Sequence, residues 1–118
     1  MMIDWLPPDD DKVNSRMACF VCRQAGVLRA AVIRVFSGAS YVGDGWPACA
    51  AHADTAIDRA FEALDDARQW NAKAGHDSSD WRVKAYAVER DEEGYPRMRR
   101  ILWTARLRPG AVQASLES

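Results

Sequence analysis

The sequence predicts an α+β fold in which a cysteine-bearing turn, a β-hairpin and one long helix are followed by a second, C-terminal β-hairpin. Three observations predict it. Cysteine and histidine occur in two spaced pairs, a helical hydrophobic period runs through the middle of the chain, and two alternating stretches flank a polar turn near its end. At 118 residues the chain has the length of one domain.

Four candidate metal ligands form the pairs Cys19-x-x-Cys22 and Cys49-x-x-His52, with 26 residues between them. Two intervening residues let both side chains of a pair turn toward one ion. Three thiolates and one imidazole complete a tetrahedral site, so we predict one structural zinc ion per chain. The alternatives are ordinary buried cysteines beside a surface histidine, and an iron–sulfur cluster.

The stretch between the two pairs predicts a hairpin. Residues 27–36 are rich in β-branched and aromatic side chains, residues 37–40 form a turn, and residues 40–42 resume the extended pattern before a Gly-Asp-Gly segment. Cys19 to Cys22 should form a tight knuckle before it.

A long amphipathic helix is predicted after Trp46-Pro47, because proline suits the start of a helix, and Gly75 is its expected stop. The apolar positions recur every three or four residues. They are Ala53, Ile57, Ala60, Phe61 and Leu64, and acidic residues occupy most of the other side. Because ligands at i and i+3 lie on one side of a helix, Cys49 and His52 can both reach one ion from its first turn.

This order of elements resembles the treble-clef group of zinc fingers. The resemblance covers residues 19–74 and rests on the two ligand pairs and the hairpin-sized gap between them. It implies a zinc knuckle, a β-hairpin and a helix that carries the second pair. The group also supports nucleases rich in histidine and asparagine, but this chain has only Asn14, Asn71 and two histidines, so we do not expect that activity.

The second hairpin should consist of residues 81–89 and 98–107, joined by a polar turn. Period-two alternation predicts one apolar face, directed to the core, and one basic face. The core face should carry Trp81, Val83, Ala85, Ala87, Ile101, Trp103, Ala105 and Leu107. The basic face should carry Arg82, Lys84, Tyr86, Val88, Arg90, Arg100, Leu102, Thr104, Arg106 and Arg108.

The basic face suits phosphate contacts by arginine and base stacking on tyrosine. Its candidate nucleic-acid-binding residues are Arg82, Lys84, Tyr86, Arg100, Arg106 and Arg108. Two other interpretations stay open: a plain solvated face, which is common in antiparallel sheets, or a protein-binding surface. Asp91-Glu92-Glu93 at the adjoining turn would repel phosphate.

The chain divides into three parts. Residues 1–18 form a partly ordered acidic arm with Trp5, which docks either on the domain or on a partner. Residues 19–108 form one zinc-stapled domain, with residues 19–75 as the zinc-finger core and residues 81–108 as the C-terminal hairpin. Residues 109–118 form a tail.

Composition narrows the function. A net charge of −1 excludes a uniformly basic nucleic-acid binder. No apolar run of membrane-spanning length and no signal peptide occur, so we expect a cytoplasmic protein without a membrane partner. Arginine makes up 13 of the 16 basic residues, which suggests a bacterial or phage genome.

No nucleophile, base and orienting group can be assembled into a catalytic site from the residues present. We therefore expect no enzyme and no small-molecule substrate, but an accessory or regulatory nucleic-acid-binding protein, or alternatively a protein-interaction adaptor.

Overall fold

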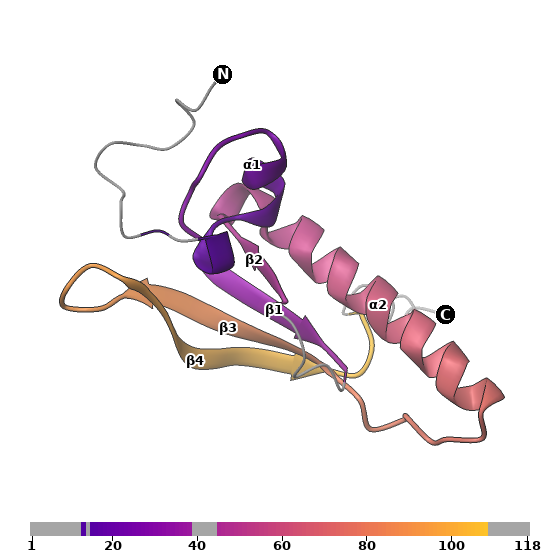
Figure 1. Ribbon diagram of the computed structural model, residues 1–118. Helices are drawn as coiled ribbons and strands as arrows, with labels where there is room; N and C mark the ends of the chain where they lie inside the picture. The colour runs from indigo at the N-terminus through magenta and orange to yellow at the C-terminus, as the bar shows by residue number, and fades with distance from the viewer. Residues whose placement is uncertain (1–12, 14, 39–44, 109–118) are drawn as a thin grey trace, which may run out of the picture.

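The computed structural model describes residue 13, residues 15–38 and residues 45–108. Residues 1–12 and 14 of the predicted acidic arm and the whole predicted tail, residues 109–118, lie outside these ranges. The α+β class is confirmed (Figure 1). The elements are η1 (Ser15–Met17), α1 (Phe20–Gln24), β1 (Ile33–Ser37), β2 (Trp46–Ala48), η2 (Ala50–His52), α2 (Ala53–Lys73), β3 (Val83–Arg90) and β4 (Pro96–Ala105).

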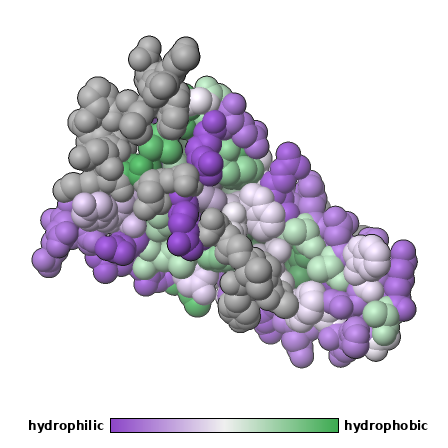
Figure 2. Space-filling model, in the orientation of Figure 1, coloured by the Kyte–Doolittle hydropathy of each residue, from purple (hydrophilic) through white to green (hydrophobic). Residues whose placement is uncertain are grey.

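All four strands belong to one antiparallel sheet with the order β2-β1-β3-β4. The second hairpin therefore extends the sheet of the first, because β3 pairs with β1 over five residue pairs. Helix α2 packs on one face of this sheet (Figure 1). Its acidic side faces away from the sheet, and Figure 2 shows hydrophilic residues along it.

The first hairpin differs from the prediction. Strand β1 begins only at Ile33. The residues just before it pair instead with the segment at residues 15–18, which we call the N-terminal segment, through an isolated bridge between Ala30 and Ala18. The predicted helix entry at Trp46-Pro47 is wrong, since these residues form β2. Pro47 is tolerated there because β2 is an edge strand, with a partner on one side only. The predicted strand at residues 40–42 lies outside the described residues.

The core lies between α2 and the sheet. Phe61 and Leu64 of α2 are buried against β1 and β3, as the helical period predicts. Trp103 of β4 closes this core by stacking on Phe61, with ring centroids 6.4 Å apart and planes 10° from parallel. The helix ends at Lys73, and Gly75 follows in the left-handed region at φ 81°, so the predicted stop is confirmed.

The predicted core face of the second hairpin is wrong at two positions. Ile101 is 52% exposed and Leu107 is 55% exposed. Between the pairs Ala85↔Trp103 and Tyr86↔Ile101 the register shifts, because β4 advances two residues while β3 advances one. Such a bulge exchanges the two faces of a strand, so Ile101 joins the side of Tyr86.

We call the sheet face opposite α2 the outer face. Strand alternation and the pairing place on it Arg34, Phe36, Lys84, Tyr86, Ile101 and Thr104. The predicted basic face also includes Val88, but this side chain is buried in a small cluster with Met17 and Ala31. The N-terminal segment therefore covers one end of the outer face.

Among the residues that the structure describes, none of the helices has the combination of length and apolar composition that a membrane-spanning segment requires.

Candidate functional site

The four predicted ligands come together at one end of the molecule. His52 Nδ1 lies 3.4 Å from Cys19 Sγ, 3.5 Å from Cys22 Sγ and 3.2 Å from Cys49 Sγ. The sulfurs of Cys22 and Cys49 are 3.9 Å apart, and all four ligand atoms lie within 4.8 Å of one another. A tetrahedral ion with bonds of about 2.3 Å to sulfur and 2.0 Å to nitrogen requires separations of about 3.8 Å and 3.5 Å. The residues therefore form a site that could hold one metal ion.

The first pair is shaped by a short helical turn. Cys19 precedes α1 and its extended backbone, with φ −54° and ψ 124°, turns the chain into the helix. The Cys19 carbonyl accepts a hydrogen bond from the N–H of Arg23, and the Cys22 carbonyl accepts from Ala25 and Val27. These bonds hold both sulfurs on the same side of a single turn.

The second pair lies just before the long helix instead of on its first turn. Cys49 precedes η2 and His52 ends it, so α2 starts one residue later, at Ala53. The carbonyl of Cys49 accepts a hydrogen bond from the N–H of His52. This tight turn sets the two ligand atoms 3.2 Å apart.

The surroundings of the cysteines determine their charge. Burial, hydrogen bonds with the Cys19 and Cys49 side chains, and repulsion between like charges together raise the pKa of Cys22 to about 11. At Cys19 burial also raises the pKa, but backbone N–H groups of Cys22, Cys49 and Val21 outweigh it, so the pKa is lowered. A bound cation would stabilise all three thiolates, and metal binding would release protons.

Arg29 adds a positive charge beside the site. Its Nη1 donates a hydrogen bond to Cys22 Sγ at 3.6 Å. Three thiolates and a neutral imidazole around a divalent cation carry a net charge of about −1. Arg29 is therefore placed to offset that charge, a role that no spacing motif in the sequence indicates.

The predicted basic residues of the second hairpin differ in their surroundings. Lys84 and Tyr86 lie together on the outer face, and exposed Arg82 precedes β3 beside them. Arg100 instead pairs with Glu89 at 3.1 Å, Arg106 with Asp80 at 2.9 Å and Arg108 with Asp58 of α2 at 2.8 Å.

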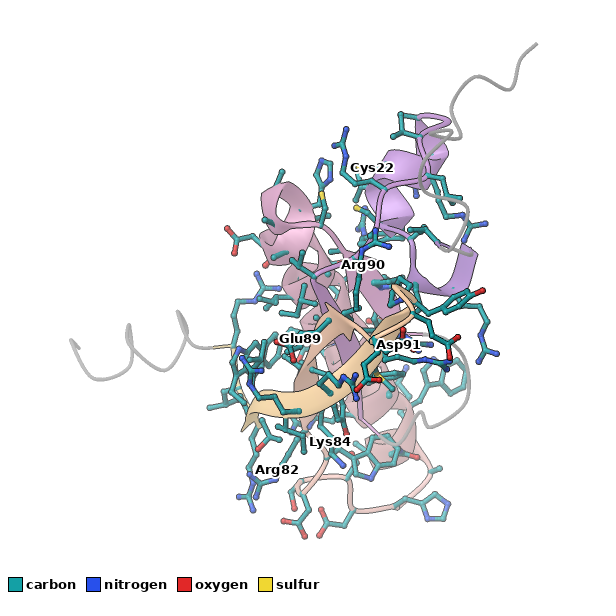
Figure 3. The ribbon with its side chains drawn as sticks, turned by 90° about the vertical axis from the view of Figure 1, so that its left-hand side faces the viewer. Cys22, Arg82, Lys84, Glu89, Arg90 and Asp91 are labelled. Atoms are coloured by element: carbon teal, nitrogen blue, oxygen red, sulfur yellow. The ribbon has the colours of Figure 1, made fainter. Side chains whose placement is uncertain are left out.

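Figure 3 places Cys22 at the end of the molecule opposite Arg82 and Lys84, with Glu89, Arg90 and Asp91 between them. The metal site and the basic residues of β3 are therefore separate features.

An aromatic pair marks the middle of the outer face. Phe36 of β1 and Tyr86 of β3 meet edge to face, with ring centroids 5.7 Å apart and planes at 89°. Arg34 places its guanidinium carbon 4.9 Å from the centre of the Phe36 ring. Sequence reasoning did not find Phe36 and Arg34, although their alternation along β1 places them on one face.

Comparisons with protein-family models, with curated proteins and with solved structures found no match.

Proposed function

We propose that Cys19, Cys22, Cys49 and His52 bind one zinc ion with a structural role. Three thiolates and an imidazole are soft and borderline ligands that suit zinc. Ligand atoms within 4.8 Å of one another fit a single ion, whereas the several metal atoms of an iron–sulfur cluster hold their ligands farther apart. Four protein ligands leave no open coordination position, which favours a non-enzymatic role.

Metal analysis tests this assignment. The purified chain should contain one zinc ion, and replacement by Co²⁺ should produce the visible absorption of a tetrahedral thiolate site. The Cys49→Ser variant should lose both. A folded sample with clearly less than one zinc ion per chain would contradict the proposal.

We also propose that the chain is an accessory or regulatory protein that binds single-stranded nucleic acid on its outer face. The observation that supports this is the grouping of Tyr86 with Lys84 and Arg82 on a sheet surface away from α2. Stacking of a base on an aromatic ring contributes about 1–3 kcal/mol, and neighbouring cations attract the backbone. Arg100, Arg106 and Arg108, which each pair with a carboxylate, complete the set of candidate basic residues.

Binding of a fluorescent single-stranded oligonucleotide, followed by anisotropy, tests this function. Lys84→Glu and Tyr86→Ala should each weaken binding, with Tyr86→Ala lowering affinity roughly 5- to 150-fold. Arg59→Glu is the matched control for Lys84→Glu, because it makes the same charge change on α2, where Arg59 is 56% exposed.

Two results would reject nucleic-acid binding: no binding at low salt, or equal losses in Lys84→Glu and Arg59→Glu. Binding led by phosphate contacts should also weaken steeply as the salt concentration rises.

A second candidate is a protein-interaction adaptor, favoured by Trp70. This side chain is 74% exposed near the end of α2, and the ammonium of Lys73 lies 5.9 Å from its ring centre. Large exposed aromatic side chains are frequent anchors of protein interfaces. A partner that co-purifies with the chain, resists high salt and is lost in Trp70→Ala would favour this function.

A further inference from the structure

A second basic feature lies at the covered end of the outer face. A cavity of about 240 Å³ opens between η1, β1 and the start of β4. We call it the arginine cavity. Its lining residues are Arg16, Met17, Arg34, Pro96, Arg97 and Met98. Three arginines from three separate elements therefore meet around one hollow, although they are far apart in the sequence.

Arg34 is the most enclosed of these arginines. It is only 7% exposed, and its Nη1 donates to Met17 Sδ at 3.8 Å while its guanidinium lies over the Phe36 ring. These contacts hold the guanidinium in a fixed orientation. A cation held in this way loses little conformational entropy when it binds a ligand.

Arg97 is oriented by the β3–β4 loop. Its Nε donates to Asp91 Oδ2 at 3.1 Å, which offsets part of its charge. Asp91 Oδ1 in turn accepts hydrogen bonds from the N–H groups of Glu93 and Tyr95, both at 2.9 Å. The acidic turn, which the sequence suggested would repel phosphate, thus uses one of its carboxylates to position an arginine.

The chemistry of the cavity favours a phosphate group. Guanidinium groups bind phosphate oxygens through paired hydrogen bonds, and Met17, Pro96 and Met98 provide apolar walls. A volume of about 240 Å³ is below the 300–1,000 Å³ typical of whole small-molecule sites. The cavity therefore fits one phosphate with part of a sugar, and a complete nucleotide would extend beyond it.

Arg34 connects the cavity to the aromatic pair. It lies directly opposite Tyr86 in the β1–β3 pairing, and its guanidinium lies over the ring of Phe36, which contacts Tyr86. A phosphate held by Arg34 would place the attached nucleotide next to the ring proposed to stack a base. An acidic peptide could supply an anion to the same arginines, but it would not use the adjacent aromatic surface in this way.

We propose that the arginine cavity binds a backbone phosphate of the single-stranded nucleic acid that stacks on Tyr86. This inference rests on the proposed nucleic-acid function and adds the residues that anchor the strand. Arg16, Arg34 and Arg97 bind the phosphate, and the strand runs from the cavity past Tyr86 toward Lys84 and Arg82.

The test combines two measurements on the full zinc-bound chain. The first is an NMR titration with inorganic pyrophosphate, which probes the cavity without a strand. The second is anisotropy of a labelled single-stranded oligonucleotide over a series of salt concentrations. The test variant is Arg16→Gln/Arg97→Gln, because both side chains are exposed and the buried Arg34 is left in place. Arg59→Gln/Lys73→Gln removes the same charge from exposed positions of α2.

Pyrophosphate should shift resonances of Arg34, Met17 and Met98 in the wild type and not in Arg16→Gln/Arg97→Gln. The test variant should bind the strand on the order of tenfold more weakly. The slope of log affinity against log salt should fall by about 0.7, the value for one phosphate of a single strand. The α2 control should change affinity by less than about twofold. Equal thermal stability of the variants excludes misfolding as the cause.

Strand binding with unchanged affinity and slope in the test variant would overturn the cavity proposal and leave the outer-face function standing. If pyrophosphate shifts the resonances of the cavity residues but the wild type binds no single strand, the proposed nucleic-acid function is overturned. The proposal that the cavity binds a phosphate of that strand is then overturned as well. Displacement of pyrophosphate by a glutamate-rich peptide, without strand binding, would assign the cavity to an acidic protein partner instead.

Discussion

Two charged side chains outside the four ligands contribute to local structure, one at the metal site and one in the β3–β4 loop. Arg29 contacts the sulfur of Cys22 from outside the ligand set, and Asp91 organises the β3–β4 loop from outside the sheet. Arg29 places a positive charge beside the Cys22 sulfur, and Asp91 places a negative charge beside the backbone N–H of Tyr95. Their effects can be measured without disturbing the core.

Arg29→Gln should lower zinc affinity about 10- to 100-fold, because loss of a group that contacts a metal ligand has effects of that size. Competition with a chromophoric chelator measures it. Arg23→Gln is the control, since Arg23 is exposed on α1 next to the same cysteine. Equal affinity of the two variants would show that the contact of Arg29 with Cys22 does not stabilise the bound state.

The pH response of the β3–β4 loop should follow Asp91. The N–H of Tyr95 lowers the pKa of Asp91 below its ordinary value of 3.8, and Arg97 adds to the shift. Because the folded pKa is depressed, the stabilisation is present above pH 3.8 and is lost as the pH falls through the lower, folded value. An NMR titration should show the amide shifts of Glu93 and Tyr95 changing with that pKa. In Asp91→Asn this transition should vanish, and its persistence would exclude Asp91 as its source.

At the scale of elements, Arg68 connects the end of α2 to the second hairpin. It donates to the carbonyl of Trp81 at 2.6 Å, to that of Arg106 at 2.9 Å and to that of Ser78 at 3.5 Å. The structure shows a single cation that joins the helix, the connection after it and the end of β4.

Arg68→Met should therefore lower the free energy of unfolding by about 2 kcal/mol, because hydrogen bonds from a charged donor are lost at partly buried carbonyls. Chemical denaturation of the zinc-bound chain measures it. Arg59→Met should change stability by less than about 1 kcal/mol, since its ion pair with Glu62 is exposed. Similar losses in the two variants would show that the carbonyl contacts of Arg68 add nothing.

At the scale of the whole molecule, the metal site is part of the main core. Cys19, Cys22 and Cys49 belong to the same buried cluster as Leu64 of α2 and Val83 of β3. Without a bound ion, buried thiols would remain at one end of that cluster. The connection that the ion would make between the ligand pair at α1 and the pair just before α2 would also be lost. The stability of the sheet should thus depend on a site that lies away from the outer face.

Removal of zinc with a chelator should unfold most of the chain in one transition. A structural zinc site contributes on the order of 10 kcal/mol to folding, which is comparable to the whole stability of a small domain. Near-ultraviolet circular dichroism, which reports on buried Phe61 and partly buried Trp103, should be lost together with the far-ultraviolet signal and return when zinc is added. A metal-free chain that keeps both signals would contradict a structural role.

The ligand set, the long helix and the order of the main elements can be predicted from the amino-acid sequence. Ligand spacing and helical periodicity are local, so Cys49 and His52, or Phe61 and Leu64, carry their information within one or two turns. The sequence did not predict β2, because a proline such as Pro47 usually marks the start of a helix. Pro47 can lie in β2 because this strand is at the edge of the sheet, where the missing N–H of proline leaves no hydrogen bond unmade.

The residues that share a surface become known only from the way the strands pair and pack. The bulge between the pairs Ala85↔Trp103 and Tyr86↔Ile101 moves Ile101 to the outer face and breaks the alternation on which the predicted basic face depends. The arginine cavity likewise exists only because η1, β1 and β4 meet in space. Register and proximity between distant segments depend on pairing energies along the whole sheet, and no local pattern in this chain encodes them.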